Sequence, residues 1–199
     1  MGEELESVLS EVRALRRADR SRNLSTLLLG LLEREWAPGE AAVIRGELIG
    51  EHQHHGQYAE ALQCLLAQEQ EEPGEPYYSL SLAEHFHYYD VDLERSLLHI
   101  TDAIRKARLD GKFLYQSLGV QARVCIETQR WALLEESLRE LAAYEHKPGN
   151  VDVFPETDFL PRIPPGTVPQ ELISAYRDRV AGLRNIGYST MLGAKHHAA

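Results

Sequence analysis

Two copies of one short pattern, a glutamate followed three residues later by a histidine, are the residues whose types and spacing point most directly to chemistry. They are Glu51 with His54 and Glu84 with His87, and the second pair begins 33 residues after the first. Side chains three residues apart on a helix share a face, so each pair would present a carboxylate beside an imidazole. Both groups bind transition metals, and two neighbouring helices would supply four ligands to one site.

Paired motifs of this kind resemble the ligand sets of carboxylate-bridged di-iron and di-manganese helical bundles. That resemblance implies a metal-dependent oxidase that holds iron, manganese or zinc through the two pairs. Such bundles also need a glutamate from each of two further helices, and Glu40, Glu47 and Glu127 are candidates by residue type only. The alternative is a surface or turn role for the histidines, because an imidazole at a helix C-terminus interacts favourably with the helix dipole. We adopt this alternative and expect no cofactor.

The elements that must position these residues are predicted to be helices. Apolar residues recur at intervals of three and four over residues 3–18, which is typical of an amphipathic helix. A second helix is predicted to start near Asn23 and to be broken by Pro38-Gly39. No alternating pattern or hairpin turn predicts a strand, so we expect an all-α protein.

Further along the chain, helices with the same apolar spacing recur at nearly constant intervals. Three of them begin 35 and 38 residues apart, at Tyr58, Leu93 and Trp131. Each is preceded by another helical segment, near residues 40–54, 77–89 and 113–128. Each helix pair has an apolar face that it cannot bury by itself, so neighbouring pairs are expected to stack and bury it jointly.

The stretch GQYAEAL (56–62) places Gly56 in a turn, Tyr58 at the start of a helix and Ala61 three residues on, with Pro73 at the end of the segment. This arrangement resembles the tetratricopeptide repeat. The stretches VDLERSL (91–97) and QRWALLEESL (129–138) match the same motif less completely. The resemblance implies a right-handed α-solenoid of stacked antiparallel helix pairs over residues 1–147, with an N-terminal pair and about three repeats.

In tetratricopeptide arrays the first helices of the repeats line a concave groove that holds a partner peptide. By that resemblance, residues from two consecutive repeats would face the groove: Tyr78, Ser81, His85, Tyr88, Gln116, Arg123 and Glu127. Tyrosine and arginine are frequent in binding hot spots, which favours this interpretation. Ordinary packing between repeats is the alternative for the aromatic residues.

After residue 147 the composition changes, because six of the nine prolines fall in residues 148–169. We expect residues 148–187 to form an extended segment that docks on the solenoid through Phe154 and Phe159, followed by a C-terminal helix. Thr167 and Gln170 form a predicted capping box at the start of that helix, and Gly187 is predicted to end it. Residues 188–199 are expected to be a flexible tail.

The net charge of −10 is concentrated in residues 33–75, where ten acidic residues face only Arg34 and Arg45. An acidic surface repels nucleic acid and attracts basic partners, so we expect a protein partner and no nucleic acid. The chain begins with acidic residues rather than a signal peptide and has no apolar stretch long enough to span a membrane. Two cysteines with no close spacing, Cys64 and Cys125, fit a reducing compartment, and we expect a cytoplasmic protein with no membrane association.

The sequence favours a protein-interaction module, such as an adaptor, co-chaperone or regulatory subunit. It contains neither a glycine-rich phosphate loop nor a GxSxG nucleophile motif, so an enzyme is the less favoured interpretation. One alternative is an acidic inhibitor or immunity protein that blocks a basic toxin or enzyme with residues 33–75. The other is the metal-dependent oxidase. The partner and the oligomeric state are not encoded in any pattern found in the sequence.

Overall fold

The computed structural model describes residues 2–19, 21–145 and 157–182. Over these ranges the secondary structure is helical and no strand is formed, which confirms the all-α prediction for the described residues. The chain divides into two compact units, Met1–Pro73 (unit 1) and Gly74–Ala199 (unit 2). None of the described helices combines the length and the apolar character that crossing a lipid bilayer requires.

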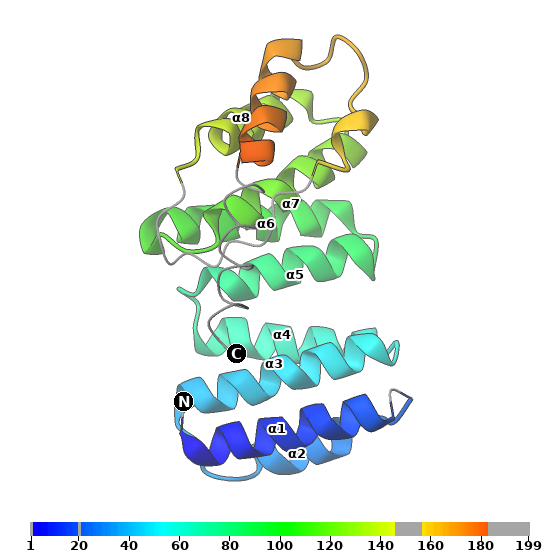
Figure 1. Ribbon diagram of the computed structural model, residues 1–199, viewed down its shortest axis with the longest axis vertical. Helices are drawn as coiled ribbons and strands as arrows, with labels where there is room; N and C mark the ends of the chain where they lie inside the picture. The colour runs from blue at the N-terminus through cyan, green and yellow to red at the C-terminus, as the bar shows by residue number, and fades with distance from the viewer. Residues whose placement is uncertain (1, 20, 146–156, 183–199) are drawn as a thin grey trace, which may run out of the picture. The chain divides into compact units, whose positions relative to one another are not determined.

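Unit 1 contains α1 (Glu3–Ala18), α2 (Ser25–Leu32), α3 (Pro38–His54) and α4 (Tyr58–Glu71), drawn in blue to cyan in Figure 1. The apolar face of α1 is buried as its spacing predicts, and it shares one core with α2 and α3. The buried members of that core are Leu5, Leu9, Val12, Leu24, Leu28, Leu31, Ile44 and Leu48. Helix α4 packs against α3.

One predicted boundary in unit 1 is wrong. Pro38 does not break a helix that began near Asn23, because α2 has already ended at Leu32. Pro38 is instead the first residue of α3. A proline fits there since the first backbone N–H groups of a helix have no intrahelical partner and the fixed φ of proline suits the first turn.

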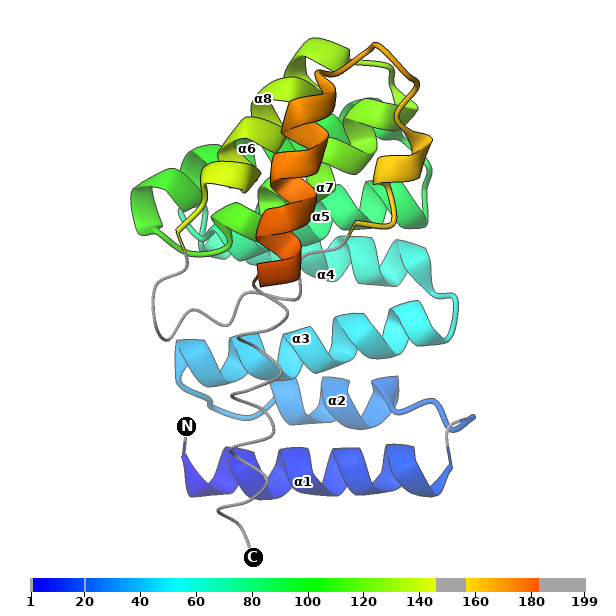
Figure 2. The same cartoon turned by 45° about the horizontal axis from the view of Figure 1, so that its top comes forward.

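Unit 2 contains α5 (Pro76–Tyr88), α6 (Leu93–Asp110), α7 (Leu114–Glu127) and α8 (Trp131–Ala143). Each helix packs against the next one along the chain, and α5 also contacts α7 (Figures 1 and 2). Helix α6 is followed by Gly111, which has φ of +80° and caps the helix in the left-handed conformation. Asp92 is the N-cap of α6, and its carboxylate accepts a hydrogen bond from the Arg95 N–H at 3.0 Å.

The turns before α4, α6 and α8 share one backbone feature, a residue with positive φ. Gly56, Val91 and Gln129 each have positive φ, of 70°, 52° and 56°, and each lies two residues before the next helix begins. The residue that follows then donates its N–H back to a carbonyl of the preceding helix, as Gln57 does to His52 at 2.8 Å. The turns before α4 and α8 are therefore equivalent, and the turn before α6 has the same features with one more residue, which is compatible with a repeat of helix pairs.

The segment that begins at residue 157 belongs to unit 2 and packs on its helices α5 to α8. A single 3-10 turn, η1 (Leu160–Arg162), is followed by a helix over 170–182, which Figure 2 shows in orange beside α8. Apolar residues of this segment join the core formed by α5 to α8: Phe159, Leu160, Ile163, Val168, Ile173, Tyr176 and Val180. The predicted docking of Phe159 is confirmed, because its side chain is only 1% exposed.

The predicted capping box at the start of the last helix is not formed. The helix begins at residue 170, and the Thr167 hydroxyl donates to the Pro164 carbonyl at 2.7 Å. Pro169 occupies the position before the helix, and its carbonyl accepts from the Leu172 and Ile173 N–H groups. Phe154, Gly187 and residues 188–199 lie outside the described residues, so the predictions made for them stay predictions.

The positive φ of Gly56 and Val91 predicts opposite effects on stability for a substitution at each position. Gly56→Ala should lower the free energy of unfolding by about 1 kcal/mol, because left-handed backbone penalises a Cβ atom although the site has open space around it. Val91→Asn should raise it by about 0.5–1 kcal/mol, because asparagine tolerates this conformation and the valine side chain is 70% exposed. Urea unfolding followed by circular dichroism measures both values. A change of the same sign in the free energy of unfolding of both variants would contradict the left-handed backbone conformation assigned to Gly56 and Val91.

The core position of Phe159 predicts that Phe159→Ala lowers the free energy of unfolding of unit 2 by about 3–5 kcal/mol. Its ring stacks on that of Tyr176 with centroids 5.9 Å apart, so its loss leaves a cavity. Trp131 of α8 reports on unit 2 by fluorescence when Trp36, the other tryptophan, is replaced by phenylalanine. The matched control is Leu98→Ala on α6, whose side chain is 67% exposed and whose loss should cost about 0.5 kcal/mol or less.

Candidate partner-binding surface on helices α5 and α7

The seven residues predicted to face a groove all lie in unit 2, on two helices that contact each other. Four are on α5 and three are on α7. Two of them, Tyr78 and His85, are buried, whereas Tyr88 is 52% exposed. The remaining four are half-buried: Ser81, Gln116, Arg123 and Glu127. The predicted set therefore divides into a buried part and a part that reaches solvent.

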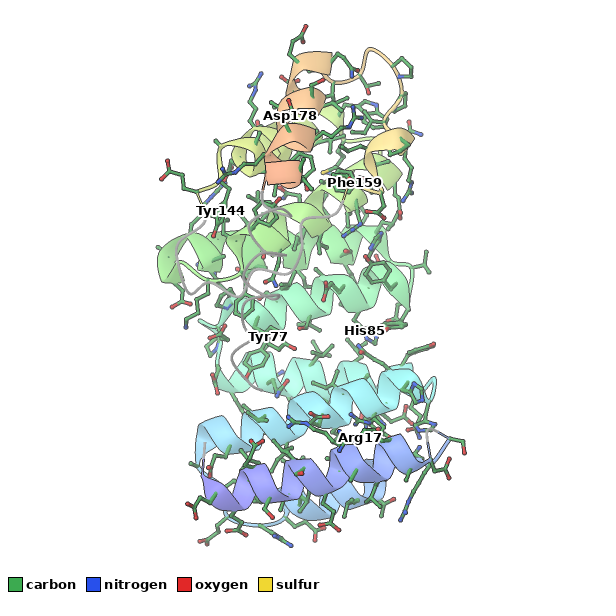
Figure 3. The ribbon with its side chains drawn as sticks, in the orientation of Figure 1. Arg17, Tyr77, His85, Tyr144, Phe159 and Asp178 are labelled. Carbon is green, nitrogen blue, oxygen red and sulfur yellow. The ribbon has the colours of Figure 1, made fainter. Side chains whose placement is uncertain are left out.

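His85 (Figure 3) is one of the buried members, and neither of its ring nitrogens has a hydrogen-bond partner among the described residues. The nearest carboxylate belongs to Asp90, whose Oδ1 lies 3.8 Å from Nε2. Burial lowers the pKa of His85, and Asp90 opposes this only in part. The ring packs beside Phe86 and Tyr89, so His85 behaves as a neutral ring among aromatic neighbours.

Arg123 on α7 binds the segment that follows residue 157. One of its guanidinium nitrogens lies 3.1 Å from Oδ1 of Asp158, and its central carbon lies 5.6 Å from the centre of the Phe159 ring. Ion pairing and a cation–π contact thus act on two successive residues of one short segment. The Arg123 side chain is only 13% exposed, so the pair is partly shielded from solvent.

Glu127, one helical turn after Arg123, joins three elements through its two oxygens. Oε1 accepts a hydrogen bond from Arg162 at 2.9 Å, and Oε2 lies 3.1 Å from Nε2 of His87 on α5. Burial acts to raise the pKa of Glu127, but its contacts with Arg162 and His87 outweigh burial and lower the pKa. His87, a predicted metal ligand, therefore has a carboxylate partner on the neighbouring helix.

Glu84 and Tyr88 are one turn apart on α5 and complete what we call the α5–α7 surface, defined by Glu84, Tyr88, Arg123 and Glu127. Glu84 is half-buried and forms no hydrogen bond or ion pair within the described part of the chain. Burial raises its pKa, and the charge of Arg123 opposes the rise. Burial also raises the pKa of Tyr88, a group that experiences the charges of the other three residues. The four side chains therefore form one electrostatically coupled surface.

The other predicted metal pair lies in unit 1, where Glu51 has a different set of partners. Its Oε1 accepts the Leu24 N–H at 2.8 Å and lies 3.1 Å from Nε2 of His55. Its Oε2 accepts two hydrogen bonds from Arg16, at 2.9 and 3.2 Å. Burial acts to raise the pKa of Glu51, yet the Leu24 and Arg16 hydrogen bonds outweigh it and lower the pKa. The carboxylate ties α3 to α1 and to the start of α2.

Among the described residues, no group of three or more His, Cys, Asp or Glu side chains is placed to hold a metal ion. Glu51 and His54 belong to unit 1, whereas Glu84 and His87 belong to unit 2. The further glutamates considered as ligands have other partners: Glu40 accepts the Gly2 N–H, Glu47 pairs with Arg16, and Glu127 binds His87 and Arg162. The metal site stays a prediction without a geometric counterpart in the described chain.

Three residues were missed as groove residues in the sequence: Glu84, which belongs to the α5–α7 surface, and Asp158 and Arg162, which bind Arg123 and Glu127 of that surface. A signal for the last two was present, since Arg123 and Glu127 have opposite charges four residues apart and so do Asp158 and Arg162. If α7 and the later segment ran antiparallel or crossed, many other pairs of opposite charge in the chain would match equally well. The order of these charges therefore became informative only once the structure had placed the two segments together. No signal marked Glu84 as half-buried.

Burial raises the pKa of Cys125 to about 12, which disfavours its thiolate as a nucleophile.

The contacts of Glu51 predict a pH-dependent loss of stability. Glu51→Gln should lower the free energy of unfolding of unit 1 by about 1–3 kcal/mol at pH 7, because hydrogen bonds to a buried charged group are lost. The folded-state pKa lies below the ordinary 4.5, so the stabilisation is present above pH 4.5 and is lost as pH falls through the folded-state value. The difference between wild type and variant should therefore shrink below pH 4.5.

Urea unfolding followed by Trp36 fluorescence, with Trp131 replaced by phenylalanine, measures this difference from pH 7 to pH 3. The control variant is Glu60→Gln, an exposed glutamate on α4 of the same unit, which should change stability by about 0.5 kcal/mol or less. A Glu51→Gln effect that stays constant down to pH 3 would contradict the role assigned to the ionised carboxylate.

Comparison with protein-family models, with curated proteins and with solved structures found no match to the chain. The likeness to tetratricopeptide repeats therefore depends on the residues quoted from the sequence. The structure is compatible with it at a coarser level, since consecutive helices pack together and three inter-helix turns each contain a residue with positive φ two residues before the next helix. The function of the chain has to be argued from the geometry of its own side chains.

Proposed function

We propose that the chain is a tetratricopeptide-like protein-interaction module, such as an adaptor, co-chaperone or regulatory subunit, whose α5–α7 surface binds a short segment of a partner. One observation carries the proposal. Arg123 and Glu127 hold Asp158 and Arg162 of a largely non-helical segment by pairs of opposite charge, at 3.1 and 2.9 Å. Side chains that bind one short segment in this way have the chemistry that recognition of a partner segment requires.

The remaining half of the surface defines the chemistry of the partner. Glu84 is a half-buried carboxylate without a hydrogen-bond donor in the described chain, and a lysine or arginine of the partner would satisfy it. Tyr88 offers an exposed ring one turn away, and tyrosine is enriched in binding hot spots. The partner segment should therefore combine a basic residue with an apolar or aromatic residue.

Selection of random peptides on the purified full chain tests this proposal. Selected peptides should be basic with an apolar neighbour, and the double variant Glu84→Gln, Tyr88→Ala should bind them about 30-fold more weakly, as expected for the loss of about 2 kcal/mol at a hot spot. Fluorescence anisotropy of the labelled peptides gives the dissociation constants. Circular dichroism and thermal melting establish that the double variant is folded.

Leu98→Ala on α6 is the matched control, because it removes an exposed apolar side chain from unit 2 outside the α5–α7 surface. It should leave the dissociation constants within about twofold. Peptides that bind wild type and the double variant equally well would refute the proposed surface. Equal weakening by Leu98→Ala would show that binding depends on general apolar exposure.

A second candidate function, inhibition of a basic toxin or enzyme, is favoured by the charges at the end of α4. Glu71 and Glu72 lie at the C-terminus of this helix, where negative charge is unfavourable and where its last turn has no basic residue. Glu71 pairs with Arg45, and Glu72 is exposed. A partner whose binding is abolished by Glu71→Gln, Glu72→Gln and by high salt, but not by the α5–α7 double variant, would favour inhibition.

A further inference from the structure

Unit 1 contains a pocket that neither the predicted groove nor the proposed function uses. Its volume is about 450 Å³, within the range of small-molecule sites. Among the described residues it is lined by Arg13, Arg16, Arg17 and His54. The three arginines are spaced at i, i+3 and i+4 near the end of α1, so they share a face, and His54 is the last residue of α3. Arg17 is labelled in Figure 3.

Arg16 is the fixed element of this pocket. It donates to Glu47 at 2.9 Å and to Glu51 at 2.9 and 3.2 Å, and the Glu51 side chain is only 1% exposed. Burial would lower the pKa of Arg16, but these hydrogen bonds outweigh it and raise the pKa. One wall of the pocket is therefore a guanidinium group held in place by two carboxylates of α3.

The other two arginines are far less neutralised. Arg13 lies 3.6 Å from a carboxylate oxygen of Glu6 and 3.9 Å from one of Glu47, in contacts at the long end of ion pairing. Arg17 forms no ion pair or hydrogen bond with the described residues. The acids that pair with these arginines are Glu6, Glu47 and Glu51, and the short contacts of Glu47 and Glu51, at 2.9 Å, are with Arg16. Positive charge at Arg13 and Arg17 is left to face the pocket beside the imidazole of His54.

We propose that this pocket binds a phosphate monoester. Guanidinium groups are the preferred protein partners of phosphate because their fork of N–H donors matches two phosphate oxygens. A phosphate monoester has nearly two negative charges, so it suits a weakly paired guanidinium group (Arg13) beside one that has no ion pair with the described residues (Arg17) better than a single carboxylate does. The pocket is larger than a phosphate group, so it also has room for the organic part of the ligand.

The same chemistry has two sources, a phosphorylated side chain of a protein and a small phosphorylated metabolite. Isothermal titration calorimetry at pH 7.4 and constant ionic strength distinguishes them with three probes: inorganic phosphate, glycerol 3-phosphate and a neutral hexapeptide containing phosphoserine. Wild type should bind at least one ester more tightly than inorganic phosphate, and the tighter of the two esters identifies the source. The unphosphorylated hexapeptide should not bind.

Arg17→Gln should weaken binding by about tenfold or more, because a charge-assisted bidentate contact is lost. Arg17→Lys keeps the charge without the fork and should give an intermediate loss. Arg34→Gln is the matched control, since it removes an exposed arginine of the same unit that pairs with Glu4 outside the pocket. Trp36 fluorescence during urea unfolding establishes that each variant keeps the wild-type fold of unit 1.

Three results would overturn the proposal. The first is the absence of heat with all three probes at millimolar concentration. The second is equal weakening by Arg17→Gln and Arg34→Gln, which would assign binding to the general charge of the unit. Wild-type affinity in Arg17→Gln together with a less stable fold would likewise overturn it, because the arginines would then act only on the dipole at the end of α1.

Discussion

A backbone residue in the left-handed conformation precedes α4, α6 and α8, and the packing of the helices on either side of these three turns depends on it. In each of these turns the next N–H returns to a carbonyl of the preceding helix, as in the bond from Gln57 to His52. The two flanking helices then lie against each other and can share an apolar face. Only Gly56 among these three residues is a glycine, so the other two turns depend on packing of the flanking helices to hold a less favourable backbone.

Periodicity predicted most helices well, because one face of each is buried and the spacing of apolar residues records that face. The errors occurred where several local signals compete. Pro38 reads equally as a stop or as a first-turn residue, and α3 uses it as the latter. Thr167 and Gln170 have capping-box spacing, yet the Thr167 hydroxyl is taken by the Pro164 carbonyl in a local turn.

The candidate site was predicted in part, and the missing part is long-range. The sequence placed Arg123 and Glu127 in a groove through the repeat resemblance, but their partners lie 35 residues further along a proline-rich segment. Glu51 illustrates the same limit. Its spacing to His54 points to a metal, whereas its oxygens bind Arg16 and the Leu24 N–H, and no local pattern encodes these partners. Ion pairs likewise offset part of the negative charge of residues 33–75, because Glu47 and Glu51 pair with Arg16 of α1.

The distribution of the two cores along the chain has a consequence for synthesis on the ribosome. The core of unit 1 uses residues between Leu5 and Leu48, so all of its residues are synthesised before those of the core of unit 2. The core of unit 2 extends from Leu80 to Val180 and needs Phe159 and Tyr176 to cover α7 and α8. Domains generally fold in order from the N-terminus as they emerge. Unit 1 can therefore form while the helices of unit 2 still expose apolar side chains.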